Sequence, residues 1–154
     1  MTDHGPLAPR LPAAFWEVPY VAARFPGSPA VARRPGLTAG ANCQLFAYEV
    51  LAHLGAGRLP DLRSDELWAD TEATHRVTDV RPLDLLLFNG TDDAYGAHVG
   101  LWVGDDAVLH LCAEAGRPVV WGLAEFAARA RYRCLVGVKR AGRGEGPASP
   151  QGAR

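Results

Sequence analysis

The sequence lacks an excess of charge of either sign. Its 154 residues include 16 Lys and Arg and 17 Asp and Glu, which give a formal net charge of −1. Proteins that bind nucleic acid or an anionic membrane usually carry a basic surface, so no such partner is expected. No apolar run is long enough to cross a membrane, and prolines interrupt the first residues, where a secretion leader would be apolar.

Disulfide pairing is not expected either. The chain has three cysteines, an odd number, and its start does not resemble a secretion signal. Thiols stay reduced in the reducing interior of cells. We therefore expect a cytoplasmic protein whose cysteines are free to react or to pack in a core.

Composition and length predict one globular domain. Hydrophobic residues make up 48% of the chain and charged residues 21%, as in ordinary soluble domains, and the length is enough for one hydrophobic core. Residues 1–26 form a proline-rich lead-in, in which 13–25 could hold a short helix. A single domain is expected over 27–140, and its first part falls in a loop predicted over 26–42. The tail 141–154 has few apolar residues and is predicted to be disordered.

The clearest element is a helix over 42–54. Its apolar side chains recur with the helical period and form one stripe, which comprises Cys43, Phe46, Ala47, Val50, Leu51 and Leu54. Asn42 is suited to cap the first turn, and Gly55 to end the last. Cys43 is then placed in the first turn, with its thiol on the side of the helix that becomes buried.

The rest of the chain predicts short helices and strands. A short helix is expected within 62–77, capped by Ser64 or Asp65, and another over 124–132. Apolar segments separated by turn-forming residues predict five strands, at 83–88, 97–104, 107–113, 118–123 and 134–140. Helices come first and an antiparallel meander follows, so the expected fold class is α+β.

Two histidines lie on the hairpin between the second and third of these strands. If Asp105 and Asp106 form a two-residue loop, His98 and His110 point to opposite faces of the sheet. If the loop has three residues, they share a face, with Cβ atoms roughly 5–8 Å apart. We favour the three-residue loop because it gathers the apolar side chains on the other face. It also places Gly100 opposite His110, which leaves room beside the imidazoles.

Cys43, His98 and His110 supply the groups needed for nucleophilic catalysis by a thiol. The thiolate is the reactive form, and both a helix N-terminus and a nearby imidazolium favour it. We expect Cys43 to be the nucleophile, His98 to take its proton and His110 to orient the His98 ring. The helix stripe should turn the thiol toward the sheet that carries both histidines, and backbone N–H groups at the helix start could bind an oxyanion.

At these positions the sequence resembles the NlpC/P60 family of cysteine peptidases. The segment "HVGLWVG" at 98–104 is similar to the family's His-Val-Gly strand, "LDL" at 83–85 to its Gly-Asp-Leu strand start, and His110 falls at its third catalytic position. The resemblance covers residues 40–140. It implies a papain-like α+β fold, with N-terminal helices packed on a small antiparallel sheet, and hydrolysis of an amide through a Cys–His–His triad and an acyl-enzyme, without a cofactor or metal.

The expected substrate is a small-molecule or peptide amide. Wall hydrolases of the family have Asp-Cys-Ser where this chain has Asn-Cys-Gln, which argues against recognition of a D-glutamyl peptide. Gln44 is expected to be exposed beside the thiol. The candidate substrate contacts are Tyr20, Asn42, Gln44, Tyr95 and Trp102.

Other interpretations of the same residues stay open. An acyltransferase or a thioesterase would use the same triad, and a non-catalytic binding domain would keep only the fold. A metal site made of Cys43, His98, His110 and Cys112 ranks lower, because the chain has no Cys-x-x-Cys pair. Asp84 is expected to brace the sheet.

Overall fold

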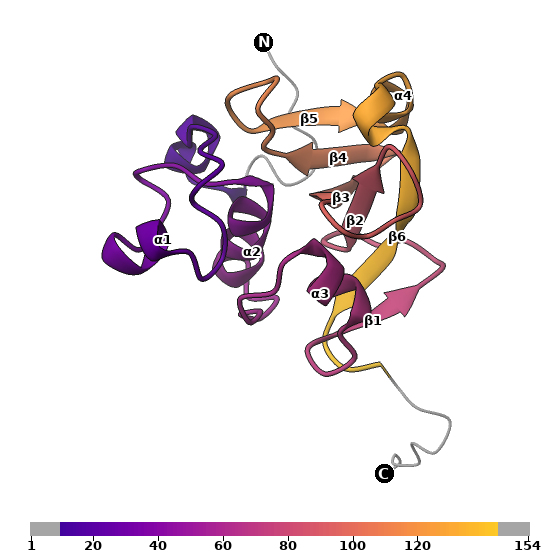
Figure 1. The fold of residues 1–154 in the computed structure, drawn as a ribbon, viewed down its shortest axis with the longest axis horizontal. Coiled ribbons are helices and arrows are strands. Elements are labelled where there is room, and N and C mark those ends of the chain that lie inside the picture. The colour runs from indigo at the N-terminus through magenta and orange to yellow at the C-terminus, as the bar shows by residue number, and fades with distance from the viewer. Residues whose placement is uncertain (1–9, 145–154) are drawn as a thin grey trace.

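The structure is a computed structural model that describes residues 10–144. The start of the predicted lead-in and most of the predicted disordered tail, 1–9 and 145–154, lie outside the described residues. The N-terminal part holds a 3₁₀-helix and three α-helices: η2 (Ala13–Glu17), α1 (Pro29–Arg33), α2 (Cys43–His53) and α3 (Ser64–Ala69). In Figure 1 α1 lies at the far left, the sheet lies at the right, and α2 lies between them.

The second half of the chain forms a six-stranded sheet. The strands are β1 (Thr74–Val77), β2 (Leu85–Asn89), β3 (His98–Gly104), β4 (Ala107–His110), β5 (Val119–Gly122) and β6 (Cys134–Ala141). Neighbours pair antiparallel in the order β1-β6-β2-β3-β4-β5. Between β5 and β6 lie α4 (Leu123–Ala127) and a 3₁₀-helix, η3 (Ala130–Tyr132), where one helix was expected.

The α+β fold class and the five predicted strands are confirmed, with three differences. β1 lies within 62–77, where the sequence predicts only a helix, because its four residues show no strand alternation of their own and form a strand by pairing with β6. Because β6 returns between β1 and β2, only β2 to β5 form a meander. The predicted loop 26–42 contains α1, where Ser28 accepts a hydrogen bond from the Val31 N–H and Pro29 begins the helix.

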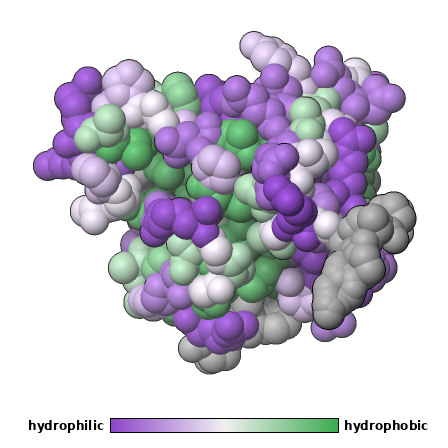
Figure 2. Space-filling view, turned by 90° about the horizontal axis from the view of Figure 1, so that it is seen from below, coloured by the Kyte–Doolittle hydropathy of each residue, from purple (hydrophilic) through white to green (hydrophobic). Residues whose placement is uncertain are grey.

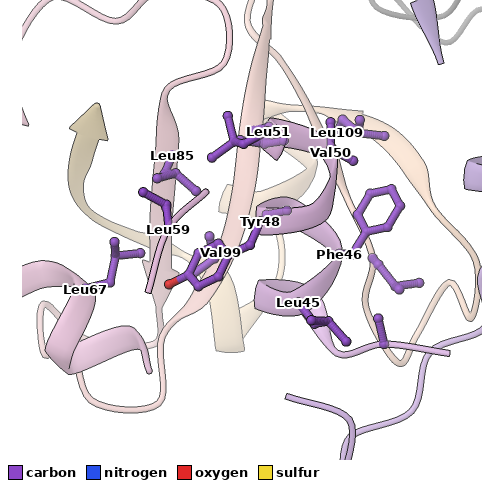
Figure 3. Close-up of a cluster of buried hydrophobic side chains, with 14 of the residues drawn as sticks. Leu45, Phe46, Tyr48, Val50, Leu51, Leu59, Leu67, Leu85, Val99 and Leu109 are labelled. Carbon is purple, nitrogen blue, oxygen red and sulfur yellow. The ribbon is translucent and has the colours of Figure 1, made fainter. Parts of the chain in front are cut away.

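The two faces of the sheet carry different side chains. On one face, which we call the aliphatic face, α2 packs against β3 and β4 and shares a core cluster with Leu85, Leu87, Val99, Leu101 and Leu109. Figure 3 shows Val50 and Leu51 of α2 among these side chains. The other face and the segment that covers it form the aromatic cluster, which comprises Leu86, Phe88, Val108, Cys112, Trp121, Phe126 and Tyr132.

The ends of the two helices next to the site are capped differently. At α2 the prediction is confirmed, because Asn42 Oδ1 accepts a hydrogen bond from the Leu45 N–H at 2.9 Å. Gly55, just beyond the helix, has a φ of 80°, which glycine adopts at no steric cost. At α3 the predicted cap is wrong. The residue before the helix is Arg63, whose N–H donates to the Glu66 carboxylate at 2.8 Å.

The histidine hairpin combines a short turn with an irregular register. Asp105 and Asp106 have φ values of 55° and 59°, which is typical of a two-residue type I′ turn. Gly104 therefore pairs with Ala107, but the register shifts between Trp102 and Gly104, so that Trp102 pairs with Val108. This irregularity restores the register that the three-residue loop predicts, with Leu101 opposite Leu109. The expected register is confirmed, and the expected loop length is wrong.

Asp84 braces the sheet as the sequence predicts. Its carboxylate is buried and accepts hydrogen bonds from Arg140 Nε and Nη2, both at 2.9 Å, and from the Arg81 N–H at 2.8 Å. A buried charge of this kind is tolerated because it is paired and its hydrogen bonds are satisfied. The contact ties the start of β2 to β6.

The molecular surface mixes polar and apolar residues. Figure 2 shows a largely hydrophilic face with hydrophobic residues gathered toward its middle. A membrane-spanning helix takes about 20 residues, and the longest helix within residues 10–144, α2, has 11. No helix in this part of the chain is long and apolar enough to cross a bilayer.

Candidate functional site

A cavity of about 430 Å³ opens at the N-terminal end of α2. It is lined by Cys43 and His98, and also by residues from several separate segments, among them Tyr20, Arg63, Arg131 and Tyr132. The sequence indicates the first three of these six. It offers no motif for the other three, because they come from unrelated segments that only the fold brings together.

His98 and His110 are joined directly. His98 Nε2 lies 2.9 Å from His110 Nδ1, and the two rings are nearly perpendicular, with an interplanar angle of 85°. Gly100 makes this arrangement possible. A Cβ at this position would lie 2.5 Å from Val108 Cγ1 and 3.3 Å from His110 Cβ, so a larger residue would displace the imidazole or its strand.

The aromatic cluster surrounds His110. The ring centroids of Trp121 and Phe126 lie 4.3 Å and 4.7 Å from that of His110, whose residue is 1% exposed. Within the described residues, His110 Nε2 is a buried side-chain nitrogen without a hydrogen-bond partner. Desolvation lowers the pKa of His110 well below its usual value, and the neighbouring His98 lowers it further.

Desolvation also keeps His98 and Cys43 neutral. Burial lowers the pKa of His98 to about 3, with a smaller contribution from the charge of Arg131. Burial raises the pKa of the Cys43 thiol to about 11, although the backbone N–H of Val99 opposes this shift. At neutral pH the resting site therefore holds a thiol and an uncharged imidazole.

The thiol and the imidazoles approach the cavity from different layers. The helix stripe turns Cys43 toward the sheet as expected, but α2 packs on the aliphatic face, whereas His110 lies among the rings of the aromatic cluster. Both Cys43 and His98 line the cavity at the start of β3. The two layers therefore meet at the end of a strand and not across one face of the sheet.

A buried arginine holds the loop that leads to Cys43. The Arg24 guanidinium donates hydrogen bonds to the carbonyl oxygens of Gly40 at 2.6 Å, Gly36 at 2.7 Å and Arg34 at 2.8 Å. The main-chain carbonyl oxygen of Arg24 accepts a hydrogen bond from the Asn42 N–H at 2.9 Å. Arg24 is not among the residues that the sequence indicates. The available signal was that the chain has no Asp or Glu from 18 to 48 to pair with it.

The predicted substrate contacts divide into two groups. Tyr20, Asn42 and Gln44 line the cavity. Gln44 is buried and not exposed as expected, because its Nε2 donates to the Leu62 carbonyl oxygen at 3.0 Å. Tyr95 is 75% exposed, and Trp102 packs beside the aromatic cluster. Neither Tyr95 nor Trp102 lines the cavity.

Cys112 lies in the aromatic cluster with the histidines' neighbours but does not line the cavity. Its residue is 1% exposed, within the aromatic cluster, and its sulfur accepts a hydrogen bond from the Ala115 N–H at 3.4 Å. Within residues 10–144 no group of three or more His, Cys, Asp or Glu side chains is arranged to hold a metal ion.

Comparison with known proteins places the fold. The sequence matches no protein-family model and no curated protein. Among solved structures it is similar to the peptidoglycan hydrolase RipB of Mycobacterium tuberculosis, with a TM-score of 0.50 and 18% identity over 91% of this chain and 73% of RipB. At this level of identity the likeness concerns the fold alone. The chain has the fold of RipB, the α+β NlpC/P60 fold that its sequence predicts.

Proposed function

We propose that the protein is a cysteine hydrolase that cleaves an amide of a small or peptide substrate through an acyl-enzyme on Cys43. The observation that carries the proposal is the 2.9 Å contact between His98 and His110 beside a cavity that Cys43 also lines. A thiol, a base within its reach and a group that orients the base are the parts of a nucleophilic triad. The likeness in fold to a hydrolase supports hydrolysis in general.

The contact between the imidazoles assigns their protons. His98 can accept the thiol proton on Nδ1 only if its own proton is on Nε2, which then donates to His110 Nδ1. The remaining proton of His110 is on Nε2 and points among the rings of Trp121 and Phe126. This bond keeps the same direction when His98 becomes protonated, so His110 orients the base throughout the reaction.

Because the resting thiol and imidazole are both neutral, proton transfer accompanies attack. The Cys43 sulfur bonds to the substrate carbonyl carbon while its proton moves to His98. Backbone N–H groups at the start of α2 stabilise the oxyanion that forms. Protonated His98 then gives the proton to the leaving nitrogen as the C–N bond breaks, which leaves a thioester on Cys43. A water molecule, deprotonated by His98, hydrolyses the thioester and restores the free thiol.

Alkylation by iodoacetamide tests the nucleophile. Cys134 is the matched internal control, because it is also a partly exposed free cysteine and has no place in the proposed triad. We expect Cys43 to react at least about tenfold faster than Cys134 at pH 7.5, since a general base accelerates reactions by about 10² or more. The rates are measured by mass spectrometry of tryptic peptides after short exposures.

The dependence on His98 separates an enzyme from an inert domain. His98→Ala should slow alkylation of Cys43 and leave that of Cys134 unchanged, whereas His53→Ala, which alters an exposed histidine, should change neither. Equal rates at Cys43 and Cys134, or a Cys43 rate that ignores His98, would contradict the proposed triad. Such a result would favour a non-catalytic binding domain.

The acyl group can be trapped directly. The protein is mixed with a panel of amides and thioesters, including peptidoglycan peptides, and quenched in acid, and the mass added to Cys43 is read by mass spectrometry. An acyl adduct that water removes indicates hydrolysis, and one that an added amine removes faster indicates acyl transfer. Failure of every substrate to modify Cys43 while iodoacetamide does so would restrict the proposal to other acyl compounds.

A further inference from the structure

We infer that the substrate of the Cys43 site carries a negatively charged group, such as a carboxylate, which Arg63 and Arg131 bind across the cavity. The inference rests on the proposed function and adds the charge of the substrate to it. It starts from the cavity lining, which contains these two guanidinium groups but no Asp or Glu side chain. The whole chain has a net charge of −1, so the positive charge is local to the site.

Neither guanidinium group is neutralised by a direct ion pair, although Glu114 lies within electrostatic range of Arg131. Within residues 10–144, neither Arg63 nor Arg131 forms an ion pair with a carboxylate. Other arginines show the contrast, since Arg129 pairs with Glu114 at 2.8 Å and Arg140 with Asp84 at 2.9 Å. A guanidinium retains its charge at every pH at which proteins are folded. A pair of them left without carboxylates at a cavity favours an anionic ligand.

Both arginines are exposed, and an aromatic ring lies near each of them. The Arg63 Cζ lies 4.0 Å from the centroid of the Phe25 ring, and the Arg131 Cζ lies 5.9 Å from that of Tyr132. A planar guanidinium held on an aromatic ring loses less conformational freedom when it binds a ligand. The ring contact therefore orients the charge of Arg63, whereas Arg131 lies at the outer limit of such a contact.

Much of the other polar lining already serves the fold. Asn42 Oδ1 accepts from the Leu45 N–H, Gln44 Nε2 donates to the Leu62 carbonyl oxygen, and Asn89 Nδ2 donates to two loop carbonyl oxygens. The arginines thus remain as the lining groups best suited to bind an anion.

The arginines also lie beside the reacting groups. The charge of Arg63 lowers the pKa of the Cys43 thiol, and the charge of Arg131 lowers the pKa of His98, although desolvation outweighs the first of these effects. One arginine therefore stands by the nucleophile and the other by the base. An anionic group bound by either arginine would bring the substrate into the cavity that Cys43 lines.

A pair of thiol reagents that differ in charge tests the inference. Iodoacetate is an anion and iodoacetamide is neutral, and both alkylate the same sulfur. We expect the ratio of the iodoacetate rate to the iodoacetamide rate to be at least fivefold higher at Cys43 than at Cys134. Salt should reduce the difference, because an ionic strength of about 1 M shortens the Debye length to about 3 Å.

Charge variants identify the source of the preference. Arg63→Gln and Arg131→Gln should each lower the rate ratio at Cys43, and the double variant should bring it to that of Cys134. Arg63→Lys and Arg131→Lys keep the charge and should retain most of the preference. Arg33→Gln, at an exposed position outside the cavity, should leave the ratio unchanged.

The outcomes separate this inference from the proposed function. A ratio at Cys43 equal to that at Cys134, or one that the glutamine variants do not change, overturns the anionic substrate. If iodoacetamide labels Cys43 at the same rate with and without His98, the triad is overturned instead. Unfolded molecules would react at the ratio of an unshielded thiol, so Arg63→Lys and Arg131→Lys, which keep the charge, distinguish loss of charge from loss of folding.

Discussion

The two faces of strands β2 to β4 are built from the same alternating segments, yet they carry different functions. The aliphatic face packs on α2 through leucine and valine side chains. The opposite face holds His110 among the aromatic rings of Trp121 and Phe126. The first face stabilises the domain and places Cys43. The second face sets the position and charge of the imidazoles, so the proposed site takes its nucleophile and its base from different layers.

The difference between the two faces shows why the imidazoles need an apolar environment. In water a histidine has a pKa of about 6.5, and it would exchange its partners freely. Among aromatic rings it stays neutral, keeps one hydrogen bond and has few alternative positions. The aromatic cluster therefore supports the site, whereas the aliphatic face supports mainly the fold.

The largest expected effect on stability follows a substitution that creates a cavity in the core next to the aliphatic face. Leu101→Ala should lower the free energy of unfolding by about 3 kcal/mol and leave the His98-dependent alkylation of Cys43 in folded molecules unchanged. Phe126→Leu, in the aromatic cluster, should cost only about 1 kcal/mol but slow that alkylation, because the ring contacts His110. Urea unfolding and peptide labelling measure the two effects. A larger change of rate for Leu101→Ala would contradict this division.

The next effect is a loss of stability at acidic pH, which the buried His98 causes. Burial lowers the pKa of His98 to about 3, so between about pH 6.5 and pH 3 the unfolded chain binds a proton that the folded protein does not. The free energy of unfolding should therefore fall, as pH decreases through this window, by up to about 1.4 kcal/mol per pH unit for this residue.

Substitution isolates this contribution. His98→Gln should make the fall of the unfolding free energy between pH 6 and pH 4 shallower, as followed by urea unfolding at each pH. His53→Gln, which replaces an exposed histidine, should leave the slope as it is. An unchanged slope in His98→Gln would show that the imidazole is protonated in the folded protein.

The smallest expected effect on stability comes from the N-terminal cap of α2, the helix that packs on the aliphatic face and begins with Cys43. Asn42→Ala removes the acceptor for the Leu45 N–H and should lower the free energy of unfolding by about 1 kcal/mol. It should also slow alkylation of Cys43, the first residue of the helix. Asn42→Ser keeps a capping oxygen and should restore most of the stability. An equal loss in both variants would mean that Asn42 acts through other contacts.

Several parts of the fold and site can be predicted because they depend on neighbouring residues. The period of the apolar residues indicates α2, and the side chain of Asn42 indicates its cap. The hairpin register that brings His98 and His110 together also follows from alternation, since only one register collects the apolar side chains on one face.

Other parts depend on contacts between distant segments. Gln44 is buried because the Leu62 carbonyl oxygen accepts its amide proton, and nothing near Gln44 in the sequence indicates that partner. Arg24 is placed by carbonyl oxygens of a loop that the same side chain orders. β1 becomes a strand only through its pairing with β6, 67 residues away for Thr74 and Ala141.

By itself the sequence determined that a thiol begins a helix and that two imidazoles share one face of a hairpin, because helix and strand periods are local properties. Only the tertiary structure decided that α2 covers the face away from His110 and that Cys43 and His98 line the same cavity. It also decided that both groups are neutral and that Arg63 and Arg131 border the cavity. Burial and the approach of separate loops depend on how the layers pack.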